Sequence, residues 1–112
     1  HVVEEHFDKD KGIKDGIFYY NNERFWECHE AFEGVWNQCY EREKELVQGI
    51  ILVAVAFAHE QENEESIGIG MLKRALEKLG TSPSMYYSID VDRIRKKIVE
   101  MQQAKKLARF EI

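Results

Sequence analysis

Apolar residues recur at helical spacing along most of this 112-residue chain. Over about residues 23–39, a wheel with 100° per residue separates an apolar, mainly aromatic arc from a polar one, which predicts an amphipathic helix. The apolar arc consists of Phe25, Trp26, Cys28, His29, Phe32, Glu33, Val35, Trp36, Cys39 and Tyr40. A histidine and a glutamate therefore share the face on which this helix should meet the core.

The same periodicity predicts four more helices. We expect them over about residues 12–20, 42–62, 67–79 and 90–110. The helix over 42–62 is apolar nearly all the way round at its centre, so it should be the central one. Gly80 and Pro83 end the helix before them, and Ser88 or Asp90 can cap the last one. No segment has the pattern of a strand.

These elements predict an all-α fold, a compact bundle of four to five mostly antiparallel helices. We expect a single domain over residues 1–112, with residues 1–11 as a loose N-terminal segment. The first dozen residues lack the apolar core of a signal peptide, and the longest apolar run, residues 46–58, is shorter than the roughly 20 residues that cross a membrane. The sequence therefore predicts a soluble, cytoplasmic protein without membrane contact.

The two cysteines are not expected to pair. If Cys28 and Cys39 share a helix, they lie roughly 16 Å apart along it, beyond the reach of a disulfide. Neither fits a zinc-ligand spacing, so both are interpreted as small apolar side chains in a reducing compartment.

Charge is unevenly distributed over the chain, whose net charge is −5. Residues 23–65 contain eleven acidic and three basic residues, whereas residues 93–109 contain seven basic residues and one acidic residue. The basic face includes Arg93, Lys96, Lys97, Lys105, Lys106 and Arg109. Because no aromatic residue interleaves it and the chain is acidic overall, nucleic-acid binding is not expected. A solvated face, or one that docks on the acidic middle of the chain, is favoured.

His29 and Glu33 stand one helical turn apart, flanked by Trp26 and Trp36. A carboxylate on an aromatic face is costly unless it is paired or hydrogen-bonded. We therefore predict a buried polar centre in which Glu33 orients His29, or in which each bonds another helix. On this interpretation, replacing Glu33 by alanine costs roughly 1–3 kcal/mol of stability.

A divalent metal site is the alternative for the same residues. Histidine and glutamate at this spacing can hold one ion, with His59 of the central helix as the third ligand and Gln48 on the same stripe. Glu30 is then the candidate proton acceptor of a metal-dependent hydrolase. The other interpretation of His59 is a capping or surface histidine near the helix C-terminus, where a positive charge is favourable. Outside the helices, His1 and His6 can also bind metal in an assay.

Other catalytic classes find little support in this sequence. It has neither the Gly-x-Ser-x-Gly turn of serine hydrolases nor a glycine-rich phosphate loop. Cys28 and His29 are neighbours on a helix and diverge by about 100°, so they cannot act as a nucleophile and its base.

The segment Tyr20–Glu30, followed by Glu33 and Trp36, resembles a microbial family of small helical proteins known as domain of unknown function 309. The likeness extends over about residues 17–79 and includes the Gln48–Gly49 pair and Asn63. It departs at Glu23, where the family usually has glycine, and in the turn after Asn63. The resemblance implies an α-helical bundle and a family-wide role for His29, Glu30, Glu33 and Trp36, but no reaction, cofactor or substrate.

Two functional hypotheses follow from the sequence. The first is a non-enzymatic interaction or structural module, a homodimer or the binder of a protein partner, which needs no cofactor. The second is a metal-binding protein or metal-dependent hydrolase that uses His29, Glu33 and His59. The module predicts that protein groups satisfy His29 and Glu33, whereas the metal site predicts further ligands near His29.

Overall fold

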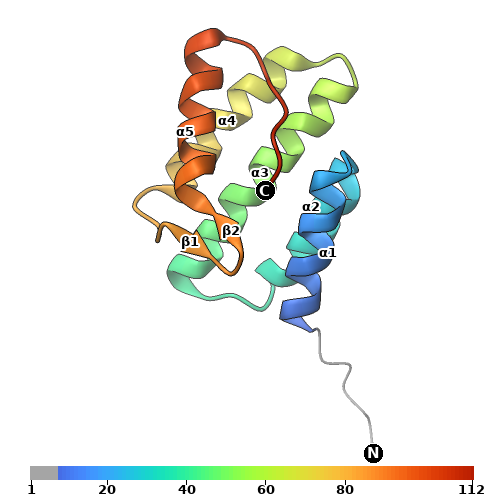
Figure 1. Cartoon of the computed structure of the whole chain (residues 1–112), viewed down its shortest axis with the longest axis vertical. Coiled ribbons are helices and arrows are strands. Elements are labelled where there is room, and N and C mark those ends of the chain that lie inside the picture. Colours follow the sequence, from blue (N-terminus) through green and yellow to red (C-terminus); the bar gives the residue numbers. More distant parts are fainter. Residues whose placement is uncertain (1–7) are drawn as a thin grey trace, which may run out of the picture.

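The computed structural model describes residues 8–112, which form an all-α bundle of five helices (Figure 1). The elements are α1 (Lys9–Asn21), α2 (Phe25–Trp36), α3 (Glu41–Gln61), α4 (Glu65–Leu79), β1 (Met85–Tyr86), β2 (Ile89–Asp90) and α5 (Val91–Ala104). The two short strands form an antiparallel hairpin ahead of α5. The predicted fold class is confirmed.

The helix α3 lies at the centre of the bundle, as its apolar sequence predicts. It packs against α2 on one side and α4 on the other, while α1 covers α2 and α5 covers α4. Eleven of its residues are buried, from Leu46 to Ala58. Polar side chains on α3 are therefore confined to its first turns and to its last turn.

Several element boundaries differ from the predicted ones. The helix α1 begins at Lys9, with the Asp8 side chain accepting a hydrogen bond from the Lys11 N–H at 3.1 Å, so residues 9–11 are helical rather than loose. The rest of the expected loose segment, residues 1–7 with His1 and His6, lies outside the described residues. The helix α2 ends at Trp36, and Tyr40, which we placed on the apolar arc, is 80% exposed.

The hairpin was not predicted, because its strands have only two residues each. Its turn contains Tyr87 with a φ of 53°, a left-handed conformation. Glycine or asparagine usually indicates such a turn in a sequence, and neither is present at this position. The predicted cap of the last helix is confirmed, since the Asp90 side chain accepts a hydrogen bond from the Arg93 N–H at 3.0 Å.

The helix α5 ends at Ala104, six residues before the predicted end. Lys105 adopts a left-handed conformation, and the following segment returns across α3 towards α2 (Figure 1). Phe110 there lies edge-on to Tyr20 and Phe57, with 5.9 Å between ring centroids in both pairs. Burial of this ring against the bundle outweighs the helical propensity of a sequence that has no glycine or proline to stop it.

Cys28 and Cys39 are free and buried, as predicted. Burial raises the pKa of the Cys28 thiol well above its ordinary value, so this side chain is an uncharged part of the core. Among residues 8–112, no helix is both long enough and apolar enough to cross a membrane.

The contact between α3 and α4 depends on a glycine. A methyl group on Gly68 would lie 2.6 Å from the carbonyl oxygen of Ala56 and 2.7 Å from Cδ1 of Leu107. Gly70, one half-turn further along α4, faces open space. Both glycines carry the general cost of a glycine inside a helix, but only Gly68 is required for close packing of the helices. Comparing substitutions at the two positions therefore distinguishes the two effects.

We predict that Gly68→Ala lowers the free energy of unfolding by about 1–3 kcal/mol, because the added methyl group forces α3 and α4 apart. The matched variant Gly70→Ala should raise it by about 0.5–1 kcal/mol, because alanine restricts the unfolded chain and favours helix. Urea unfolding monitored by circular dichroism measures both. Equal effects of the two substitutions would contradict the close contact.

Candidate functional site

Trp26, His29 and Glu33 lie along one stripe of α2, at the border of its buried face. The buried residues of this helix are Phe25, Cys28, Phe32 and Val35. His29 Nε2 lies 3.1 Å from Glu33 Oε2, and the two side chains are 29% and 57% exposed. Trp26 is 40% exposed.

The predicted burial of the polar centre is therefore wrong. No charged or polar residue within residues 8–112 is buried, and Glu33 is open to water. The wheel placed His29 and Glu33 on the apolar side correctly, but each lies one position after a core residue, Cys28 or Phe32. A step of about 100° is enough to carry such a side chain from the core to its edge.

His59 is positioned in the last turn of α3 and is partly buried. Its Nδ1 lies 3.0 Å from Glu64 Oε1. The Trp26 ring contacts both His29 and His59 edge-on, with 6.0 Å between centroids in each case. The two imidazoles therefore adjoin the same indole on one face of the protein.

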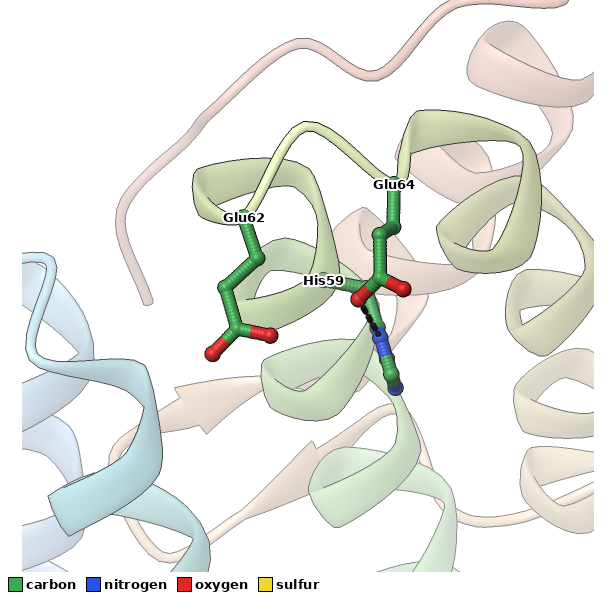
Figure 2. Close-up of side chains that lie close together, drawn as sticks. All are labelled: His59, Glu62 and Glu64. Atoms are coloured by element: carbon green, nitrogen blue, oxygen red, sulfur yellow. Dashed lines mark hydrogen bonds and ion pairs between the residues drawn. The ribbon is translucent and has the colours of Figure 1, made fainter.

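The three ligands predicted from sequence are His29, Glu33 and His59. Their donor atoms do not converge on one position that a single ion could occupy. The group that does converge within residues 8–112 consists of His59, Glu62 and Glu64, which offer one nitrogen and two carboxylate oxygens, all within 4.8 Å of one another (Figure 2). We call this group the His59 corner. It shares only His59 with the predicted set.

The turn between α3 and α4 builds the His59 corner. Asn63 adopts a left-handed conformation with φ of 62°. The N–H of Glu64 donates to the His59 carbonyl at 2.9 Å, and the N–H of Asn63 donates to the Glu60 carbonyl at 3.1 Å. This pair of bonds is the Schellman arrangement of a helix C-terminus. It folds Glu64 back beside the histidine five residues before it.

Sequence reasoning missed Glu62 and Glu64 as site residues. Glu62 is exposed, but its carboxylate reaches the corner. The available signal was Asn63, because asparagine after a helix favours the left-handed conformation that returns the chain across the last turn.

The other acidic residues near the corner are engaged elsewhere. Arg109 donates to Glu60 Oε1 at 2.7 Å and lies 2.8 Å from Glu23 Oε2. The Leu107 N–H donates to Glu65 Oε2 at 3.1 Å. The C-terminal segment therefore neutralises part of the acidic middle of the chain, as one interpretation of its basic residues predicted.

The remaining predicted site residues lie apart from the corner. Gln48 is eleven residues before His59 on α3, about 16 Å along the helix axis. The Glu30 side chain is exposed and makes no hydrogen bond or ion pair within the described part of the chain. Trp36 is partly buried, and the Lys44 ammonium lies 4.0 Å from its ring centroid.

The donor set of the His59 corner suits a divalent transition metal. One imidazole nitrogen and two carboxylates are ligands that Zn²⁺, Co²⁺ and Ni²⁺ accept. Donor atoms bound to one such ion lie about 3 Å apart, because each bond is about 2.0–2.2 Å long. His59 and Glu64 already have this spacing. Rotation of the exposed Glu62 side chain would bring its carboxylate to the same spacing from the other two donors.

Two comparisons place the chain among known proteins. The family model described as Domain of unknown function (DUF309) matches residues 13–71, a span that contains both α2 and the whole His59 corner. A protein of Aquifex aeolicus (strain VF5), described as uncharacterized, is 26% identical over 96 residues. That alignment covers 85% of this chain but only 29% of the relative, so the chain spans less than a third of its length.

We predict that Glu33→Ala changes the free energy of unfolding by no more than about 0.5 kcal/mol, because its contact with His29 is solvent-exposed. Glu30→Ala is the matched control, since it makes the same change on the same helix without a contact to lose. Urea unfolding of both variants isolates the His29 contact. If the free energies of unfolding of the two variants differed by 1–3 kcal/mol, the result would support the buried pair predicted from sequence and contradict the exposed contact.

Proposed function

This chain belongs to the family described as Domain of unknown function (DUF309), and we propose that it binds a divalent cation at the His59 corner. The observation that carries the proposal is the convergence of His59, Glu62 and Glu64 on a space smaller than 5 Å, at one end of the central helix. The proposal concerns binding by this domain. The relative is much longer than this chain, so the proposal does not extend to the activity of a longer protein that contains this domain.

The charge of the corner favours a cation. Glu62 and Glu64 each bring a carboxylate, and neither makes an ion pair with lysine or arginine within residues 8–112. Glu60 and Glu65, on either side, are held by the C-terminal segment. The corner therefore keeps two carboxylates that no lysine or arginine of the described chain neutralises, while its acidic neighbours are already bonded to the C-terminal segment.

The geometry also favours binding because part of the site is held in place. The Schellman turn fixes the backbone of Glu64 relative to His59, and contact with the Trp26 ring restricts the imidazole. Less conformational freedom is then lost when an ion binds, which raises affinity. The exposed side chain of Glu62 can then rotate to supply the third donor.

Three protein donors leave further coordination positions for water, the arrangement of hydrolytic zinc sites. Such a reaction also needs a proton acceptor near the ion. The side chain of Glu30, the acceptor suggested by the sequence, makes no hydrogen bond or ion pair with the corner residues, so the proposal is limited to cation binding.

A second candidate function is the binding of a protein partner or a second copy of this chain. The exposed Trp26 ring favours it, since tryptophan is enriched among residues that dominate interface energies. The two candidates are compatible because the ring contacts His59, so an ion at the corner would sit beside this surface.

The test is a calorimetric titration with Zn²⁺ of a chain in which His1 and His6 are alanine, which removes histidines outside the described residues. We expect one ion per chain. His59→Ala should weaken binding by more than about a hundredfold, which exceeds the usual cost of losing an outer-shell contact. His29→Ala is the matched control, because it removes an imidazole at the same 6.0 Å from Trp26, and it should bind normally.

Glu62→Gln provides a second variant, because this exposed side chain can change without disturbing the fold. It should weaken zinc binding and leave thermal unfolding of the metal-free protein unchanged. Equal loss in the His29 and His59 variants, or no binding by the parent chain, would contradict the proposal.

A further inference from the structure

A cavity of about 670 Å³ opens at the other end of α3 from the His59 corner. Its walls come from the first turns of α3, the end of α4, the turn at residues 80–83 and Tyr86 of β1. This volume lies within the range of about 300–1,000 Å³ that small-molecule sites usually have. The cavity has no part in the proposed cation site.

The larger part of the accessible surface inside the cavity is apolar. The exposed Pro83 and the partly buried ring of Tyr86 supply accessible hydrocarbon. Leu46 of α3 and Leu79 of α4 also line the cavity but are almost completely buried. Thr81 and Ser82 add hydroxyl groups. A ligand with an apolar body would therefore remove hydrocarbon surface from water on both sides.

The acidic residues of the cavity wall already have cationic or hydroxyl partners. Glu43 lies 2.8 Å from the Lys9 ammonium and accepts a hydrogen bond from the Tyr86 hydroxyl at 2.8 Å. Glu45 lies 3.0 Å from the Lys78 ammonium. Burial alone would raise the pKa of Glu43, but these hydrogen bonds outweigh it and lower that pKa. Glu43 is therefore a carboxylate whose charge is balanced within the protein.

Arg42 is the one charged residue lining the cavity that has no ion-pair partner within residues 8–112. Its side chain is exposed at the rim. With Lys9 balancing Glu43 and Lys78 balancing Glu45, the guanidinium supplies the unbalanced charge of the site. A planar guanidinium binds a carboxylate through two parallel hydrogen bonds.

We propose that this cavity binds a small organic carboxylate with an apolar body. The carboxylate pairs with Arg42 at the rim, and the apolar body lies against Pro83 and the Tyr86 ring. A neutral ligand of the same shape leaves the guanidinium without a partner, and an organic cation meets the same positive charge. The site should therefore discriminate by charge as well as by shape.

The test compares two matched pairs of probes, phenylacetate with phenylacetamide and 3-methylbutanoate with its amide. Each is titrated into the full ¹⁵N-labelled chain, and backbone amide shifts are followed. We expect both carboxylates to shift the amides of Leu46, Thr81 and Ser82 with dissociation constants of about a millimolar or below. The two neutral probes, phenylacetamide and 3-methylbutanamide, should bind at least about tenfold more weakly than the matching carboxylates.

Arg42→Gln should remove the preference for the carboxylate, weakening its binding by about tenfold or more without affecting that of the amide. Arg74→Gln is the matched control, because Arg74 is exposed on α4 and does not line the cavity. No shift at the cavity with either carboxylate, or equal binding of acid and amide, would overturn the proposal. Zinc is absent throughout, so the outcome is independent of the cation site.

Discussion

The structure depends on the need to cover α3 on every side. A helix that is apolar around most of its circumference exposes hydrocarbon wherever a neighbour is missing, and α2 and α4 supply that cover along most of its length. The cover from α4 is close because Gly68 lets its backbone approach the carbonyl oxygen of Ala56. Polar chemistry is consequently displaced to the two ends of α3, where the His59 corner and the cavity beside Arg42 are found.

The C-terminal segment links the elements around the corner. Phe110 fills a position among the aromatic rings of α1, α2 and α3, and this places Arg109 between Glu23 and Glu60. Two of the acidic residues that would otherwise compete for a cation are thus held by one guanidinium. The carboxylates of Glu62 and Glu64 stay beside His59, where a single ion can join them.

The helices could be predicted from the sequence because each buries a periodic stripe, and the apolar content of α3 identified it as central. The end of α5 could not, since nothing in the segment after Ala104 disfavours a helix and only the docking of Phe110 decides the matter. The same holds for the hairpin, whose two-residue strands are too short to leave a pattern.

The candidate site was predictable only in part, for a related reason. A helical wheel gives the direction of His29 and Glu33 but not the position of the core's edge, so their exposure was not foreseen. His59 was identified as a candidate ligand because it lies on the same stripe of α3 as Gln48. Its partner Glu64 lies beyond the helix, and their proximity depends on the left-handed Asn63 and the two hydrogen bonds that follow from it.

The most direct test of the central claim is zinc K-edge X-ray absorption on the one-to-one complex, with His1 and His6 replaced by alanine. The His59 corner predicts a single imidazole nitrogen, with oxygen as every other donor, at about 2.0–2.2 Å. Scattering from two imidazoles would instead indicate a site that joins His29 to His59, and sulfur in the coordination shell would indicate a cysteine. Either result would contradict a cation site built by the turn between α3 and α4.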